Sequence, residues 1–155
     1  MDHTSKIWDV ETGKCIYTLE GHAGEIVALS FNTDGDKLLT ASFDNTARLW
    51  DVASGECIYT LEGHIAELSC GSFDFTGDSI LTGSIDRTAR LWDVYSGKLI
   101  YEFRGHEDEV LDAQFSATGN KLATAGSDGT ARIYNTFTGA CEGLLQGHEG
   151  EISKI

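Results

Sequence analysis

The sequence contains no proline, a single methionine, and only 11 Lys and Arg residues against 25 Asp and Glu residues. Without proline, its turns must be made by Gly, Asp, Asn, Ser and Thr, and the 18 glycines fit that requirement. The shortage of basic residues leaves a net charge of −14. Nucleic acids and anionic membranes are bound mainly through Lys and Arg, so this charge disfavours both and favours a protein partner with a basic surface.

Long apolar segments are missing too. No stretch reaches the roughly 18 apolar residues that a transmembrane helix requires, so we do not expect membrane insertion. The first ten residues lack the basic and then apolar segments of a secretory signal, and the four cysteines are expected to be reduced in a cytoplasmic protein. A hydrophobic content of 41% is enough to build a folded core.

Motifs of catalysis and cofactor binding are also absent from the sequence. It contains no phosphate-binding loop, GxGxxG, GxSxG or HExxH motif. The cysteines form no CxxC pair of the kind that binds zinc or acts in redox chemistry. We therefore expect no enzymatic activity, no metal and no cofactor.

What the sequence does contain is a repeat of 42 residues. Gly-His pairs recur four times and Trp-Asp pairs three times at this spacing, at Gly21-His22, Gly63-His64, Gly105-His106, Gly147-His148, Trp8-Asp9, Trp50-Asp51 and Trp92-Asp93. The next Trp-Asp position holds Tyr134-Asn135. No insertion interrupts the spacing, so each copy is expected to build the same unit. Another repeat position holds cysteine in three copies, at Cys15, Cys57 and Cys141, and leucine in the remaining copy, at Leu99. Because this position accepts leucine, we expect it to be a packing position.

The repeated unit is predicted to consist of four short strands. In the first complete copy these are 25–31, 37–42, 46–51 and 57–61, separated by turn residues. Segment 25–31 is apolar enough to be buried on both faces, whereas 46–51 alternates. The apolar spacing of three and four that marks a helical repeat does not occur. Four antiparallel strands in about 42 residues are typical of a β-propeller blade.

The Gly-His, Asp and Trp-Asp signature resembles the WD40 family over the whole chain. The resemblance implies an all-β fold with complete propeller blades at 24–61, 66–103 and 108–145, the back half of a blade at 1–19, and the first strand of another at 150–155. Propellers close with about 4–8 blades. The sequence is therefore expected to be an incomplete propeller and part of a longer protein, and a ring completed by several copies is the alternative.

In the WD40 family, the repeated histidine joins a buried hydrogen-bond network with a hydroxyl, the turn Asp and the Trp indole. Carried over by position, the sets are His22, Thr40 or Ser42, Asp44 and Trp50; His64, Thr82 or Ser84, Asp86 and Trp92; and His106, Thr124, Asp128 and Tyr134. Because the set recurs in every blade, we interpret it as a structural frame and not as a catalytic triad or metal site. The third blade, which lacks the Trp, is expected to be the least rigid.

Partner binding is expected on the loops at one rim. WD40 proteins commonly use the residues after Gly-His and the residue before the turn Asp. The first set is acidic and comprises Glu25, Glu67, Glu107, Asp108, Glu109 and Glu151, and the second comprises Phe43, Ile85 and Ser127. An apolar contact flanked by acidic groups would receive a Lys/Arg-rich partner segment. The alternative is that the acids are merely solvated and the apolar tips pack locally.

A narrower resemblance rests on three segments. GHIAELSCGSFDFTGDSILTGSIDRTARLWD and GHEDEVLDAQFSATGNKLATAGSDGTARIY, with GHEGEISKI after them, are similar to ciliary WD-repeat proteins that assist the assembly and transport of outer dynein arms. This resemblance implies an adaptor in the cilium or at its base, with axonemal dynein and intraflagellar transport proteins as partners. The alternatives are another WD40 adaptor, such as a ubiquitin-ligase substrate receptor or signalling scaffold, and a propeller enzyme.

Overall fold

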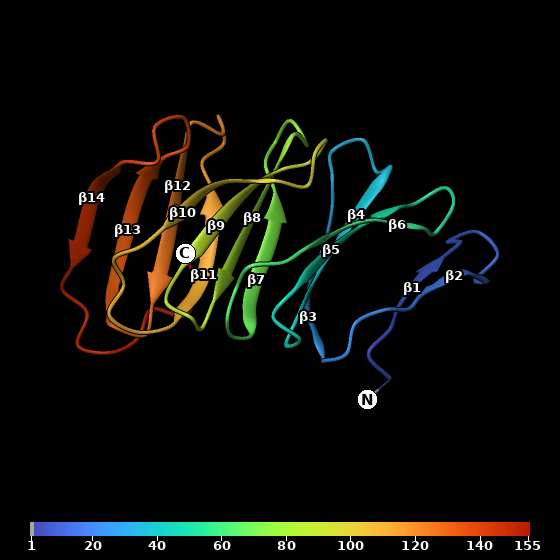
Figure 1. Cartoon of the computed structure of the whole chain (residues 1–155), viewed down its shortest axis with the longest axis horizontal. Coiled ribbons are helices and arrows are strands. Elements are labelled where there is room, and N and C mark those ends of the chain that lie inside the picture. Colours follow the sequence, from blue (N-terminus) through green and yellow to red (C-terminus); the bar gives the residue numbers. More distant parts are fainter. Residues whose placement is uncertain (1) are drawn as a thin grey trace.

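The computed structural model describes residues 2–155, which form fourteen β-strands in four antiparallel sheets (Figure 1). Met1, the first residue of the expected half blade at 1–19, lies outside the described residues. Within residues 2–155, no helix is long and apolar enough to cross a membrane. The all-β prediction is confirmed, with three four-stranded sheets and one partial sheet.

Each four-stranded sheet is a meander in which consecutive strands pair. The first blade comprises β3 (Ile26–Phe31), β4 (Lys37–Ser42), β5 (Ala47–Asp51) and β6 (Cys57–Leu61). The second comprises β7 (Leu68–Phe73), β8 (Ser79–Ser84), β9 (Ala89–Asp93) and β10 (Leu99–Phe103). The third comprises β11 (Val110–Phe115), β12 (Lys121–Gly126), β13 (Thr130–Asn135) and β14 (Cys141–Gln146). The two-stranded sheet comprises β1 (Ser5–Trp8) and β2 (Cys15–Leu19).

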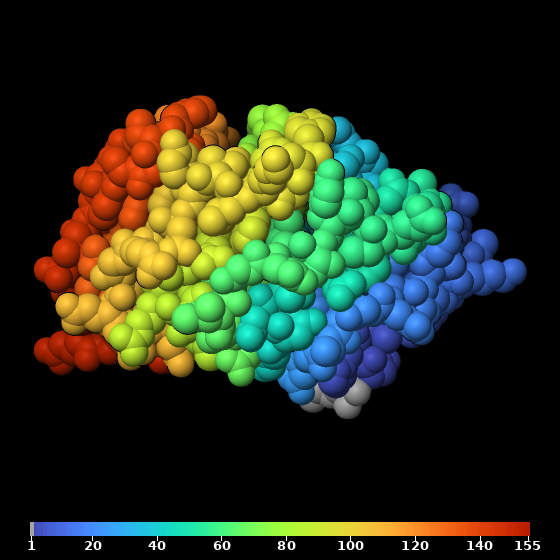
Figure 2. All heavy atoms as spheres, viewed as in Figure 1, coloured from blue at the N-terminus to red at the C-terminus, as the bar shows by residue number. Residues whose placement is uncertain are grey.

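The hydrophobic core lies between neighbouring sheets. Leu39 and Leu49 of the first blade pack with Leu68 and Ile80 of the second, and a similar cluster joins the second blade to the third. Burying one such side chain stabilises the fold by about 1.5–3 kcal/mol. In Figure 2 the blades follow one another in sequence order, from the blue end of the molecule to the red end. Neighbouring blades therefore pack face to face through a shared apolar core.

A tyrosine on the outer strand fastens each sheet to the next. The Tyr59 hydroxyl donates a hydrogen bond of 2.7 Å to the Tyr95 carbonyl of the second blade, and its ring lies against Gly97. A Cβ atom at Gly97 would come within 2.7 Å of that ring, so the position requires glycine. Tyr17 and Tyr101 make the same hydrogen bond at their own junctions.

The turns between the second and third strands share an unusual backbone conformation. Asn45, Arg87 and Gly129 occupy one repeat position with φ of 71°, 72° and 73°. Glycine and asparagine tolerate this left-handed region, whereas arginine is strained there. The strain falls on an exposed residue of the second blade.

The innermost strand of the first blade differs from its prediction. Val27, Leu29 and Phe31 of β3 are 38%, 59% and 55% exposed, so the strand is not buried on both faces. The partial sheet packs through Ile7 and Leu19 on Leu38 and Trp50, which belong to β4 and β5. That packing leaves one face of β3 open to solvent.

The strand expected at 150–155 does not form. A strand requires a hydrogen-bonded neighbour, and no strand of residues 2–155 pairs with this segment. Instead, Ile152 donates a backbone hydrogen bond to the Gly126 carbonyl and Ile155 donates one to the Asp112 carboxylate. The segment therefore folds back over the third blade, and the C-terminus is drawn beside β11 in Figure 1.

Candidate functional site

The meander topology divides the loops between two opposite rims. The turns between second and third strands, together with the segments that link one blade to the next, lie at one end of the strands. This end is called the Gly-His rim, and its loops are 20–25, 43–46, 62–67, 85–88, 104–109 and 127–129. The turns after the first and third strands form the far rim, at 32–36, 52–56, 74–78, 94–98, 116–120 and 136–140.

Beneath the Gly-His rim, the second blade contains a continuous hydrogen-bonded chain of four side chains. His64 Nδ1 lies 2.8 Å from Asp86 Oδ2, and His64 Nε2 lies 2.9 Å from Thr82 Oγ1. Trp92 Nε1 donates to the same Thr82 hydroxyl at 2.9 Å. With the Nδ1 proton facing the carboxylate, the Thr82 hydroxyl donates to His64 Nε2 and accepts from the indole.

The first blade repeats this chain through His22, Asp44, Thr40 and Trp50. The sequence had left two hydroxyls open in each of these blades, and threonine occupies the central place in both. Ser42 and Ser84 instead accept a hydrogen bond from the backbone N–H two residues later, at the turn Asp.

The third blade contains a shorter chain. His106 bonds to Asp128 at 3.0 Å and to Thr124 at 2.7 Å. The Tyr134 hydroxyl donates to the Arg104 carbonyl at 3.1 Å, whereas the Trp indoles of the other blades donate to the central threonine hydroxyl. His106, Asp128 and Thr124 are therefore linked to one another. Tyr134 instead bonds to the segment that connects β10 to β11.

The charge states and burial of the His and Asp side chains fit a structural role in these networks. Burial would raise the pKa of the Asp44 carboxyl, but hydrogen bonds from Thr46, the Ala23 N–H and His22 outweigh it and lower the pKa to about 2. Burial lowers the pKa of His22, which keeps its imidazole neutral. In the second blade, the His64 and Asp86 side chains are each only 1% exposed. These groups are closed off from any substrate and already hydrogen-bonded to one another.

The predicted rim residues are brought together in pairs. A backbone hydrogen bond joins the acidic residue and the turn-tip residue of each blade, between Glu25 and Phe43, Glu67 and Ile85, and Glu109 and Ser127. Phe43 is exposed, whereas Ile85 and Ser127 are half-buried. Glu107, Asp108 and Glu151 are exposed, and Glu151 has no such turn-tip partner in residues 2–155.

One residue at this rim was missed by sequence reasoning. Ile65 is 84% exposed, and its backbone N–H donates to the Asp86 carboxylate. The hydrogen bond holds the backbone of the loop in place, and the side chain points into solvent. The available signal was the repeat itself, since the other copies have Ala23, Glu107 and Glu149 at this position. At a position that is otherwise small or acidic, Ile65 adds an exposed apolar side chain to the rim.

The cysteines correct another expectation. Cys15, Cys57 and Cys141 are exposed on outer strands, so their repeat position faces solvent and is not a packing position. Cys70 is buried, and burial together with the nearby Asp112 charge raises the pKa of its thiol to about 11. Within residues 2–155, no cluster of three or more His, Cys, Asp or Glu side chains could hold a metal ion.

Several known proteins share single repeats with this chain. WD repeat-containing protein 37 is 44% identical in Xenopus tropicalis and 42% in Homo sapiens over 43 residues, which are 28% of this chain and 9% of each protein. Coatomer subunit beta'-1 of Arabidopsis thaliana is 48% identical over 33 residues, or 21% of this chain and 4% of that protein. These relatives are not dynein assembly factors, so they do not support the narrower resemblance.

The family model described as WD40, WD domain, G-beta repeat, matches residues 13–51, 55–93 and 97–135. Each match begins at the glycine of one outer turn and ends at the Trp-Asp position, or its Tyr-Asn counterpart, of the next blade. Together the three matches cover most of the chain. The protein therefore belongs to the WD40 repeat family.

Proposed function

We propose that this chain is a protein-binding scaffold whose Gly-His rim receives a basic segment of a partner protein. The observation that carries the proposal is the pairing of an acidic residue with a turn-tip residue at the same place in each blade. One backbone hydrogen bond fixes each pair, and the buried histidine network holds the turn beneath it. The binding groups are thus preorganised on a rigid frame.

Charge and apolar contact both favour a basic and partly apolar partner. The exposed acids Glu107, Asp108 and Glu151 add to the three paired ones, in a chain whose net charge is −14. Phe43 and Ile65 supply exposed apolar side chains on the same rim. A surface lined by charges of one sign raises the association rate of an oppositely charged partner by about 10- to 1,000-fold at low salt.

The test is charge reversal at the rim. The double variant Glu67→Lys/Glu109→Lys should slow association with a basic partner at least 10-fold at low salt, and less at physiological salt. The control is Glu11→Lys/Glu56→Lys, which makes the same change in net charge at exposed positions of the far rim, in turn 52–56 and in the β1–β2 turn 9–14. Equal slowing by both pairs would show that only overall charge matters and would refute the rim as the site.

A narrower role is supported by the segments that resemble ciliary WD-repeat proteins. On that basis we propose an adaptor that links axonemal outer dynein arms to intraflagellar transport in the cilium and at its base. Affinity capture from ciliated cells with the wild-type chain should enrich axonemal dynein and intraflagellar transport proteins. The rim double variant should lose them and the far-rim control should keep them. Enrichment of ubiquitin-ligase subunits or signalling proteins instead would favour the other WD40 adaptor classes.

A further inference from the structure

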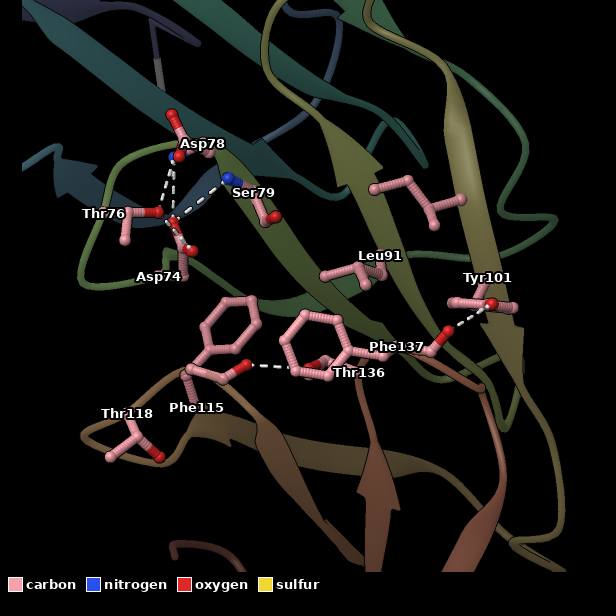
Figure 3. A pocket seen from close by; sticks show the side chains of 12 residues that line it. Asp74, Thr76, Asp78, Ser79, Leu91, Tyr101, Phe115, Thr118, Thr136 and Phe137 are labelled. Atoms are coloured by element: carbon pink, nitrogen blue, oxygen red, sulfur yellow. Dashed lines mark hydrogen bonds between the residues drawn. The ribbon is translucent and has the colours of Figure 1, made fainter.

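The far rim carries a groove between the second and third blades, of about 470 Å³ (Figure 3). Leu91, Ile100, Tyr101, Phe115 and Phe137 contribute its apolar lining, and Asp74 and Asp78 its charged lining. Figure 3 shows the two aspartates on one side and Phe115 and Phe137 facing them. Phe137 is 75% exposed, so an aromatic surface is already presented to solvent.

The groove results from a local departure from the repeat. Ser79 lines it, whereas the equivalent positions of the other blades hold Lys37 and Lys121. In the first blade, Lys37 Nζ lies 2.9 Å from Asp36, the counterpart of Asp78, and neutralises it. The short Ser79 side chain removes both the bulk and the positive charge from this position in the second blade.

The two aspartates of the groove are consequently left without a cation. Asp74 accepts hydrogen bonds from the Asp78 and Ser79 N–H groups and from the Thr76 hydroxyl, and Asp78 accepts one from the Tyr95 hydroxyl. No Lys or Arg lines the groove, and no ion pair reaches either carboxylate within residues 2–155. The hydrogen bonds fix the carboxylates in place but leave their charge uncompensated.

We propose that this groove is a second docking site, which binds a protein segment in which Lys or Arg alternates with large apolar side chains. The basic groups would meet Asp74 and Asp78, and the apolar groups would pack on Phe115 and Phe137. The two rims are separated by the length of a strand of five or six residues, roughly 17–20 Å. Both could be occupied at once, so the scaffold would bridge two partners.

The test uses a fluorescein-labelled peptide with three arginines alternating with leucine and phenylalanine, titrated against the full chain by fluorescence anisotropy at physiological salt. Ser79→Lys should weaken binding at least 10-fold, because it restores the lysine of the neighbouring repeats. Those repeats accommodate lysine here, so the variant should fold. Phe137→Ala, at an exposed position, should weaken binding about 5-fold. A peptide with serine in place of leucine and phenylalanine should bind at least 10-fold more weakly.

The matched control is Ala53→Lys, which also adds one positive charge but lies at an exposed position in turn 52–56 of the first blade, outside both the groove lining and the Gly-His rim. It should change binding less than 2-fold. Weakening by Ala53→Lys as strong as that by Ser79→Lys, or no effect of Ser79→Lys, would overturn the proposal. Self-association of the wild-type chain that Ser79→Lys abolishes, seen by sedimentation velocity, would assign the groove to a second copy and also overturn it.

The two rims are kept apart by repeating the titration in Glu67→Lys/Glu109→Lys. The groove should still bind the peptide in this background, and Ser79→Lys should again weaken that binding at least 10-fold. If the peptide binds only through the Gly-His rim, the double variant removes all binding and the groove proposal fails alone. If the double variant leaves the affinity unchanged, this peptide binds the groove alone, and the rim proposal stands or falls by its own association experiment.

Discussion

Replacing the central threonine of one network by valine should reveal how much each blade depends on it. Thr82→Val keeps the shape of the side chain and removes only the hydroxyl. Trp92 Nε1 and His64 Nε2 would then both lose their partner in a buried site. The equivalent change in the third blade, Thr124→Val, deprives only His106 Nε2, because Tyr134 donates elsewhere.

The expected magnitudes follow from the number of groups left unpaired. A buried donor or acceptor without a partner costs about 1–3 kcal/mol. Thr82→Val therefore loses about 4 kcal/mol of unfolding free energy and Thr124→Val about 2 kcal/mol, since valine fills the same space and opens no cavity. The comparison between the two variants cancels much of the effect of swapping a hydroxyl for a methyl group.

Urea unfolding followed by tryptophan fluorescence and by far-ultraviolet circular dichroism measures both free energies. Thr40→Val should match Thr82→Val, because the first blade has the same four-membered chain. If Thr82→Val and Thr124→Val cost the same within about 0.5 kcal/mol, the indole bond contributes nothing and the reasoning about the network is wrong.

Three further outcomes are expected. Arg87→Asn should stabilise the chain by about 0.5–1 kcal/mol in urea titrations, because asparagine tolerates a positive φ, as Asn45 does; a loss of stability would contradict the strain. Tyr59→Phe should cost about 0.5–1.5 kcal/mol by removing one hydrogen bond between blades, and an unchanged midpoint would refute that fastening. The free energy of unfolding should fall as the pH drops below 6.5, because the pKa of His22 is lowered in the folded state and its imidazole is protonated first in the unfolded chain. It should fall again from about pH 3.8 towards 2 as Asp44 is protonated, whereas a flat profile over pH 7 to 3 would contradict both shifts.

The repeat made the fold and the alignment of equivalent residues predictable from the sequence. A spacing of 42 residues without insertion placed Gly, His, Asp and Trp at matching points, and the strands of the first blade fall within one residue of their predicted bounds. Periodicity could not show whether a given face is covered. The exposure of Leu29 and the missing strand at 150–155 depend on which neighbours are present, and an amino-acid pattern does not record them.

The parts of the candidate sites that escaped prediction are departures from the repeat. Ile65 breaks a small or acidic position and Ser79 breaks a lysine position, but the meaning of each depends on the loop that surrounds it. The hydroxyl of Tyr134 is a further case. Its sequence position suggested that it could take the place of an indole, whereas the longer reach of the phenol carries it to the Arg104 carbonyl.

The buried networks form a frame whose strength follows the number of linked groups in each blade. Amide hydrogen exchange resolved by strand measures this in the unmodified chain. We expect β4 and β8 to be protected to a similar degree and β12 to exchange faster than both. Equal protection of all three strands, or slowest exchange in β12, would contradict a frame that depends on the number of linked groups.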